Sequence, residues 1–238
     1  MDQVTAAIVI IGDEILSGRT QDTNTSWIAT ELNSRGIQLK EVRVVSDETD
    51  KIIEAVDALR PQYTYVFTTG GIGPTHDDKT AQAIADAFKT PLEMHDQAKK
   101  VLEDYYPPEK RNDARMKMAM IPVGATLIDN PISAAPGFCV ENVYVMAGVP
   151  AIMKAMFNGF ADGLAGGYSV HSRSHLFTCG EGDLAAPLAD LQDRFSDVEI
   201  GSYPGDMDSQ RHQVTVVLRH KDTDRLDEAY EALIKITI

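Results

Sequence analysis

The chain has 238 residues, 43% of them hydrophobic and 24% charged, a composition typical of folded soluble proteins that excludes a disordered chain. Its 22 Lys and Arg residues against 36 Asp and Glu residues give a formal net charge of -14, which disfavours nucleic acid and anionic membrane surfaces as partners. An anionic small molecule would therefore have to be held by local groups.

The cysteines and the N-terminal residues bear on location. Cys139 and Cys179 lie far apart without metal-ligand spacing, so they predict neither a disulfide framework nor a zinc site and favour a reducing compartment. Residues 1–14 carry no basic segment, and their apolar run is too short for a signal sequence or a membrane span. We expect a cytoplasmic protein that does not enter a membrane.

Strand-like and helix-like segments alternate through the first two-thirds of the chain, which predicts a mostly parallel sheet with helices on its faces. Residues 6–11 (AAIVII) form a continuous apolar run, as expected for a strand covered on both faces. Further strands are predicted at 39–45, 63–68 and 142–146, and helices at 25–35, 49–59, 80–88 and 151–160.

A polar insertion and a second domain complete the expected organisation. Residues 92–120 are predicted to be helical, in two parts at 95–106 and 109–120 that Pro107 and Pro108 separate. The sequence GLAGG at 163–167 breaks the alternation, so we expect domains at 1–166 and 167–238. The second domain is predicted to be a small α+β unit, with strands at 171–178, 198–202 and 213–220 and helices at 183–194 and 224–235.

The loop TTGGIGPTHDDKT at 68–80 lies between a predicted strand and a predicted helix. Gly70 and Gly71 can adopt positive φ and let backbone amides approach a ligand, while Gly73 and Pro74 set a tight turn. A helix N-terminus binds anions through its free N–H groups. A turn that needs glycine only for its own geometry explains the loop equally well, because it matches neither the dinucleotide fingerprint nor the P-loop.

Asp77 and Asp78 end this loop, where two carboxylates would repel a phosphate. An acidic residue at this position commonly caps the following helix. Alternatively, one carboxylate holds a divalent cation such as Mg²⁺, and the cation bridges to a diphosphate. Both interpretations hold if Asp77 caps the helix and Asp78 binds the metal.

Two more acidic segments follow predicted strands at the edge where open parallel sheets bind ligands. The first is GDEILSG at 12–18 with DTN at 22–24, although turn and helix-cap roles also explain residues 22–24. The second contains Asp47, which could join Asp78 around one ligand or, with Ser46, cap a helix.

The loop NPISAAPG at 130–137 is predicted to be rigid, with small side chains that let a flat ligand lie close. Arg115 and Lys117 are candidates for an acidic partner, although solvated residues on a helix are the plainer interpretation. The histidines lack metal-site spacing, and no G-x-S-x-G turn indicates acyl transfer.

These segments resemble a known family in their order and spacing. The motifs GDEILSG with DTN, VVSDE, TTGGIGPTHDD, RMKMAMIP, NPISAAPGF and MAGVPAIM are similar to the molybdopterin-binding domain shared by MogA/MoaB proteins and the N-terminal part of the competence/damage-inducible protein CinA. The resemblance covers about residues 6–165, and residues 171–238 resemble the small KH-like unit that follows in CinA-type proteins. The deamidase domain of full-length CinA is not in this sequence, so deamidation is not expected.

The resemblance implies a three-layer α/β/α domain, a homo-oligomer, and a ligand that is a phosphorylated pterin or a nucleotide. In MogA-like enzymes, which adenylylate molybdopterin, the two functionally important aspartates match Asp47 and Asp78. In CinA-type proteins the domain is associated with metal-dependent hydrolysis of ADP-ribose. Asp13 departs from the CinA pattern, which commonly has Asn there, and leans towards the molybdopterin proteins.

We therefore expect hydrolysis of an ADP-ribose-type diphosphate with Mg²⁺ or a similar ion. Molybdopterin adenylyl transfer and a non-catalytic pterin- or nucleotide-binding module remain the alternatives. Asp47 and Asp78 are the expected catalytic residues and metal ligands. The expected ligand-binding residues are Gly12, Asp13, Glu14, Asn24, Thr69, Gly70, Gly71, Gly73, Pro74, Ser133, Pro136, Gly148 and Pro150.

Overall fold

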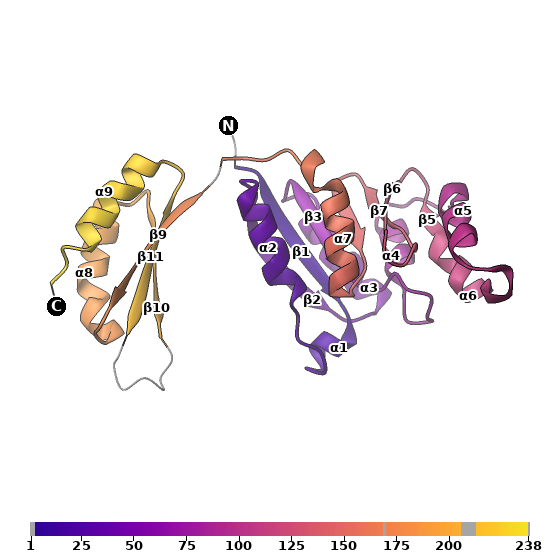
Figure 1. The fold of residues 1–238 in the computed structure, drawn as a ribbon, viewed down its shortest axis with the longest axis horizontal. Helices are drawn as coiled ribbons and strands as arrows, with labels where there is room; N and C mark the ends of the chain where they lie inside the picture. The colour runs from indigo at the N-terminus through magenta and orange to yellow at the C-terminus, as the bar shows by residue number, and fades with distance from the viewer. Residues whose placement is uncertain (1–2, 169, 206–212, 238) are drawn as a thin grey trace. The chain divides into compact units, whose positions relative to one another are not determined.

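The computed structural model describes residues 3–168, 170–205 and 213–237 (Figure 1). The chain divides into two compact units, Met1–Gly167 and Tyr168–Ile238. Among the helices in the described ranges, none is both long and apolar enough to cross a membrane.

The first unit is built on a six-stranded sheet in the order β2-β1-β3-β8-β7-β6. The four strands from β2 to β8 are parallel, and β7 and β6 add to them in antiparallel pairs. Its strands are β1 (Thr5–Ile11), β2 (Gln38–Val45), β3 (Tyr65–Thr69), β6 (Thr126–Ile128), β7 (Gly137–Val140) and β8 (Val143–Met146).

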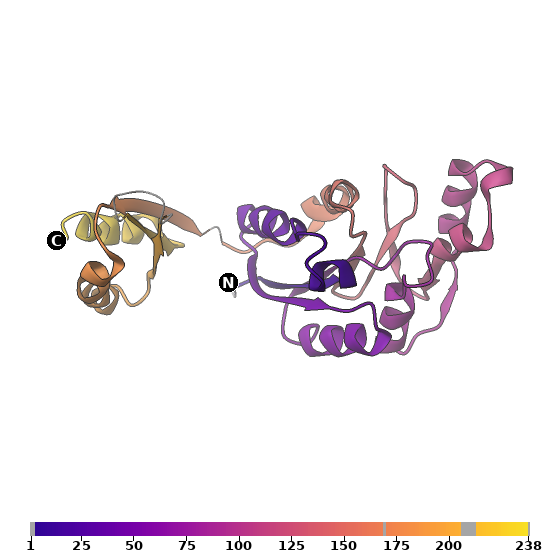
Figure 2. The same ribbon diagram turned by 90° about the horizontal axis from the view of Figure 1, so that it is seen from below.

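Helices cover both faces of this sheet because its central strands are apolar on both sides. Ala7 and Val9 of β1 pack with α3 and α4, while Ile8 and Ile10 pack with α2 and α7. Figure 2 shows α2 and α7 on one face and α3 on the other. The helices are α1 (Asp13–Leu16), α2 (Asn24–Ser34), α3 (Thr49–Leu59), α4 (Thr80–Ala87) and α7 (Pro150–Phe160). The expected three-layer, mostly parallel α/β fold is thus confirmed.

The insertion at 92–120 differs from the prediction of two helices. It opens with β4 (Leu92–Met94), which pairs with β5 (Met120–Pro122) in a separate antiparallel ladder. The first expected helix is α5 (Asp96–Tyr105), whereas the second is broken into η1 (Pro108–Lys110), α6 (Asp113–Met116) and η2 (Lys117–Ala119). Asn112 restarts the chain as an N-cap, since its side chain accepts from the Arg115 N–H, and this interrupts a continuous helix.

The second unit is an α+β arrangement, as expected. Its antiparallel sheet has the order β10-β11-β9, and its core joins Val216 and Leu218 of β11 to Leu184 and Leu226 of the two helices. A short 3-10 helix, η3 (Ala161–Gly163), precedes it in the chain. The unit's elements are β9 (His171–Phe177), α8 (Glu181–Arg194), β10 (Glu199–Pro204), β11 (Val214–His220) and α9 (Thr223–Leu233).

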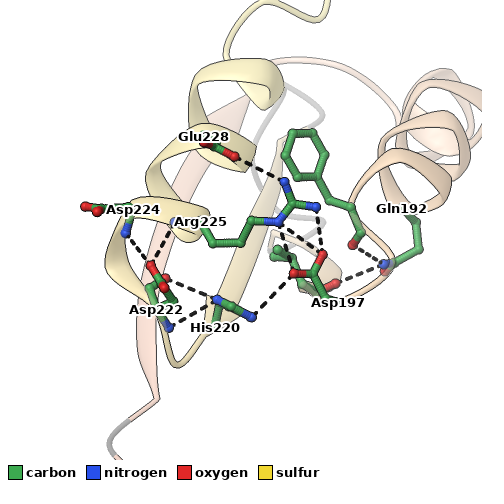
Figure 3. Close-up of polar contacts among 9 residues, drawn as sticks. Gln192, Asp197, His220, Asp222, Asp224, Arg225 and Glu228 are labelled. Atoms are coloured by element: carbon green, nitrogen blue, oxygen red, sulfur yellow. Dashed lines mark hydrogen bonds and ion pairs between the residues drawn. The ribbon is translucent and has the colours of Figure 1, made fainter.

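Arg225 at the start of α9 ties that helix to the turn after α8 (Figure 3). Its Nη2 and Nε donate to the two carboxylate oxygens of Asp197 at 2.8 and 3.0 Å, and Nη1 donates to Glu228 at 3.1 Å. These hydrogen bonds from Arg225 hold the pKa of the Asp197 carboxyl down, from 3.8 to about 2. Asp222 caps α9 by accepting from the N–H groups of Asp224 and Arg225.

Candidate functional site

A cavity of about 440 Å³ opens at the carboxyl ends of the parallel strands. Loops that follow β1, β2, β3 and β8 reach it, and the insertion adds Tyr106 and Met118. This is the edge at which open α/β sheets bind ligands. The lining residues are Ile11, Glu14, Asp47, Gly70, Gly71, Ile72, Gly73, Pro74, Asp77, Asp78, Tyr106, Met118, Asn130, Ser133, Ala135, Ala147, Gly148, Val149 and Ile152.

The glycine loop has a conformation that only glycine adopts without strain. Gly70 has φ +109°, and a Cβ there would lie 2.1 Å from the Ile11 carbonyl oxygen. Gly71 has φ +67°, with Thr80 Oγ1 only 2.2 Å from the position of a Cβ. Thr80, fully buried, closes the loop by donating its N–H to the Gly71 carbonyl and its hydroxyl to the Gly70 carbonyl, both at 3.0 Å. The loop is therefore a fixed backbone wall of the cavity.

Asp78 lies folded over this loop. Its Oδ2 accepts from the Thr75 N–H at 2.8 Å and also from the Thr75 hydroxyl. The same oxygen lies 2.7 Å from where a Cβ of Gly73 would be, so the carboxylate occupies space that only glycine leaves open. The sequence GIGPTHDD thus fixes the position of one carboxylate, that of Asp78, at the cavity.

Asp77 does not cap the following helix, contrary to one of the two roles expected of it. Helix α4 begins at Thr80 with Lys79 as its N-cap, and no side chain makes the capping hydrogen bond. Asp77 lines the cavity instead, and the Thr75 hydroxyl beside it lowers the pKa of its carboxyl.

Asp47 follows β2 and lines the same cavity. It does not cap α3, whose N-cap Glu48 lacks a side-chain bond, but accepts from the Asp13 N–H through Oδ2 at 2.9 Å. Partial burial raises the pKa of the Asp47 carboxyl above its usual value; the hydrogen bond from the Asp13 N–H lowers it, and repulsion from Asp13, Glu14 and Asp77 raises it further. Carboxylates crowded in this way favour a nearby cation.

The donor set fits a divalent cation that shares its coordination with a ligand. Among the described ranges, no three Asp, Glu, His or Cys side chains lie together as a ready metal cage. Asp47 and Asp78 line one cavity and would contribute two carboxylate ligands. Mg²⁺ is typically held by one or two carboxylates, with water and substrate phosphate completing its octahedron. That the cation is bound by these two residues remains a prediction.

Lys117 connects the insertion to the glycine loop at 68–80. Its Nζ donates to the carbonyls of Thr75 at 2.9 Å and Asp78 at 2.8 Å. A solvated residue is the plainer interpretation of the sequence here, but the Lys117 side chain, though exposed, ties together segments about forty residues apart. The Arg115 guanidinium lies 4.9 Å from the centre of the Tyr106 ring, which lines the cavity, and so supports that wall.

Asn130 organises the small-residue loop from its first position, and its side chain is 7% exposed. Its Nδ2 donates to Ser133 Oγ at 2.7 Å and to the Ala135 carbonyl at 2.8 Å, while Oδ1 accepts from the N–H groups of Ile132 and Ser133. Ala134 is held at φ +64°, a conformation that non-glycine residues adopt infrequently. The predicted rigidity of this loop therefore has a specific source.

A smaller cavity of about 50 Å³ adjoins the main one at the starts of α2 and α7. Ile11, Glu14 and Gly148 line both cavities. The remaining lining residues are Ile10, Ile15, Thr20, Gln21, Asp22, Thr23, Asn24, Thr69 and Pro150.

The structure distributes the predicted site residues among three places. Those lining the main cavity are Glu14, Asp47, Gly70, Gly71, Gly73, Pro74, Asp78, Ser133 and Gly148. Those in the smaller cavity are Asn24, Thr69 and Pro150, with Glu14 and Gly148 shared. Gly12, Asp13 and Pro136 line neither, although the Asp13 backbone orients Asp47.

Sequence reasoning missed several lining residues. Tyr106 and Met118 belong to the insertion, and nothing local indicates that it folds against the glycine loop. Ile72 and Ile152 are apolar positions that a sequence assigns equally well to a core. Asn130 carried a usable signal, because Asn before Pro commonly starts a side-chain-stabilised turn.

The fold and cavity together define a three-layer α/β protein with a glycine loop and carboxylates around one ligand site. Residues 7–165 match a family described as probable molybdopterin binding domain, and residues 169–237 match the FAD synthase, middle domain. The chain therefore belongs to the molybdopterin-binding domain family, of the MogA, MoaB and CinA type. The region expected to resemble a KH-like unit is the one that matches the FAD synthase middle domain.

Individual relatives agree with this assignment. The chain is 34% identical over 229 residues to a probable FAD synthase of Caenorhabditis briggsae, an alignment covering 84% of this chain but 43% of that protein. The chain thus spans less than half of that relative. An Archaeoglobus fulgidus protein is 36% identical over 83% of this chain and 84% of its own length. The crystal structure of a CinA protein with unknown function from Thermoplasma acidophilum superposes with TM-score 0.65 and 31% identity, covering 68% of this chain and 99% of that one.

Proposed function

We propose that this protein binds an adenine-containing diphosphate in the main cavity and hydrolyses it with a divalent cation, ADP-ribose being the reference substrate. The observation that carries the proposal is the convergence of Asp47 and Asp78, from two different loops, on a cavity walled by the glycine loop. Diphosphate cleavage needs charge neutralisation and positioning more than covalent chemistry from the protein.

The chain's own residues have separable roles in this reaction. The amides of the rigid glycine loop orient phosphate oxygens, and Asp47 and Asp78 hold the cation in place. The bound cation would neutralise phosphate charge and lower the pKa of a water molecule. Asp47 is suited to orient a water molecule that would attack one phosphorus as the bridging P–O bond breaks. ADP-ribose and water then give AMP and ribose 5-phosphate.

The name of the nematode relative supports a dinucleotide ligand. FAD contains an adenylyl group joined through a diphosphate, as ADP-ribose does, so one site chemistry would serve both compounds. We therefore include FAD beside ADP-ribose as a candidate substrate, and propose a cytoplasmic homo-oligomer as the working form.

Pterin adenylyl transfer is the second candidate, and membership in the molybdopterin-binding family favours it. It uses the same edge and the same carboxylates, but joins an adenylyl group to a phosphorylated pterin. It predicts turnover only when molybdopterin and ATP are both present.

Phosphorus NMR of ADP-ribose, and separately of FAD, with protein and Mg²⁺ or Co²⁺ tests the proposal. We expect AMP as a product in at least one reaction, no product in EDTA, and loss of product in Asp78→Ala with its fold retained by circular dichroism. A folded wild type that turns over neither compound refutes hydrolysis. Calorimetry with ADP-ribose and FAD then detects binding without turnover. A separate reaction with molybdopterin and ATP detects adenylyl transfer.

A further inference from the structure

Strand β2 forms one outer edge of the six-stranded sheet, and among the described strands it pairs only with β1. An edge strand presents a row of unpaired N–H and C=O groups, which proteins usually protect with charged residues or a bulge. In β2 both devices fall at Lys40, an exposed residue that the pairing with β1 skips. Val42 and Val44 then follow at 39% and 40% exposure, so the second half of this edge lacks that protection.

The backbone groups of Val42 and Val44 point away from β1. Gly12, directly after β1, donates its N–H to the Val45 carbonyl at 3.1 Å, so Val45 turns its backbone groups towards β1. Backbone groups alternate in direction along a strand, so those of Val44 and Val42 face outwards. In an antiparallel pair, two directly opposed residues of this kind exchange two N–H···O=C hydrogen bonds. The edge is therefore oriented to receive a further antiparallel strand at Val42.

Charge selects the register in which β2 can pair with a second copy of itself. A two-fold axis through Val42 places Glu41 of each copy opposite Arg43 of the other. Moving the axis by one residue places Glu41 against Glu41 or Arg43 against Arg43. Moving it by two places Lys40 against Lys40 or Glu41 against Asp47. Like charges directly opposite each other destabilise paired strands, so the neighbouring registers are disfavoured and the one at Val42 is complementary.

The charged side chains at this edge are already held in place. Arg43 Nε donates to Glu41 Oε1 at 2.7 Å, and the Tyr63 hydroxyl donates to Glu41 Oε2 at 2.8 Å. The Arg43 and Glu41 side chains remain 34% and 33% exposed, so they can still meet a facing strand. A second copy would complete a ring of four alternating charges. On the other face of the strand, Val44 would lie against the aliphatic stem of Lys40 of the second copy.

We propose that the outer edge of β2 is an interface with a second copy of this chain. The two β2 strands pair antiparallel about a two-fold axis at Val42, and the two six-stranded sheets become one continuous sheet. This interface gives the proposed homo-oligomer a specific surface, and it does not depend on the hydrolysis reaction proposed for the main cavity.

Charge reversal at the two facing positions tests the register. Glu41→Arg places arginines against arginines, and Arg43→Glu places glutamates against glutamates. Each variant should raise the dissociation constant of the dimer about tenfold or more, measured by sedimentation velocity over a concentration series. In an equal mixture of the two variants, one chain carries two arginines and the other two glutamates at these positions. Opposite charges then face each other again, and the mixture should sediment as a heterodimer.

Two exposed valines supply a second, matched pair of variants. Val42→Lys places two ammonium groups at the two-fold axis and should also weaken the dimer about tenfold or more. Val101 lies on α5 and is 38% exposed, close to the 39% of Val42, so Val101→Lys should leave the dimer intact. Circular dichroism and thermal unfolding of all the variants show whether each one is folded.

The outcomes separate this inference from the proposed hydrolysis. A wild-type protein that stays monomeric at every concentration overturns the interface. An oligomer that Glu41→Arg and Val42→Lys leave intact also overturns it, because the copies then associate through another surface. Folded single variants whose mixture remains monomeric overturn it as well. In each case turnover of ADP-ribose by the wild type, followed by phosphorus NMR, decides the hydrolysis independently.

Discussion

Gly73→Ala should move the Asp78 carboxylate while leaving the stability of the fold almost unchanged. A Cβ at residue 73 would lie 2.7 Å from Asp78 Oδ2, whereas ordinary contact begins at 3.4 Å, so the oxygen must retreat by 0.7 Å (3.4 − 2.7). The side chain can rotate to do so, because Asp78 is only half-buried and Gly73 does not have positive φ. The rotation lengthens the hydrogen bond from the Thr75 N–H to Asp78 Oδ2, which is 2.8 Å long and fixes the carboxylate.

Displacements of about 1 Å in a catalytic group lower rates by as much as about 100-fold. We therefore expect Gly73→Ala to lose about 10- to 100-fold in turnover of ADP-ribose, followed by phosphorus NMR, and to require more Mg²⁺. Thermal unfolding should change little, since Ala in place of Gly also reduces the entropy of the unfolded chain.

Gly159→Ala is the matched control. Gly159 lies in α7, and no atom comes within 4 Å of where its Cβ would be, so this variant should gain about 0.5–1 kcal/mol in stability with unchanged turnover. Wild-type turnover and Mg²⁺ dependence in Gly73→Ala would refute the role given to Asp78. If activity instead falls in proportion to the fraction of folded protein, the loss comes from instability and not from the displaced Asp78 carboxylate.

Substitutions at three further positions test other parts of the structure. Lys117→Met removes two hydrogen bonds to the glycine loop and should raise the KM for ADP-ribose about tenfold. Lys117→Arg should recover part of this loss, and a KM in Lys117→Met equal to that of the wild type would contradict the prediction. Asn130→Ala should destabilise the protein by about 2 kcal/mol in urea unfolding, because it leaves loop amides and carbonyls unpaired. Asp197 contributes stability that is fully present above its unfolded pKa of 3.8 and is lost as the pH falls towards about 2. The hydrogen-exchange protection factors of α9, which correct for the intrinsic pH dependence of exchange, should therefore fall over that range in the wild type. Asp197→Asn should reduce this fall and leave the part that comes from the Asp222 cap, whose pKa is also lowered.

The central sheet could be predicted because burial on both faces leaves a direct trace in the sequence. The run at 6–11 has no polar residue, and the structure places β1 at the centre of two hydrophobic layers. The glycine loop could be predicted equally well, since Gly70 and Gly71 both adopt the positive φ that their residue type favours. These features depend on interactions within a few residues, which a local pattern records.

The remainder depends on contacts that no local pattern encodes. Strands β4, β5 and β6 have three residues each, too few for an alternation to be recognised, and they form only by pairing with distant segments. The Lys117 bonds to Thr75 and Asp78 likewise join separate segments. The expected cap role of Asp77 failed because Thr80 closes the loop through backbone carbonyls and leaves the carboxylate to the cavity.

The acidity of the cavity predicts that a diphosphate ligand needs a cation for binding, and not only for the proposed cleavage. Glu14, Asp47, Asp77 and Asp78 line it, and no Lys or Arg stands among the described lining residues. At separations below the Debye length of about 8 Å, salt screens such charges only in part, so a bare diphosphate would be repelled. Partial burial raises the pKa of the Asp47 carboxyl, and repulsion from Asp13, Glu14 and Asp77 adds to that rise. It follows that EDTA should weaken binding of ADP-ribose in calorimetry, and not only stop its cleavage.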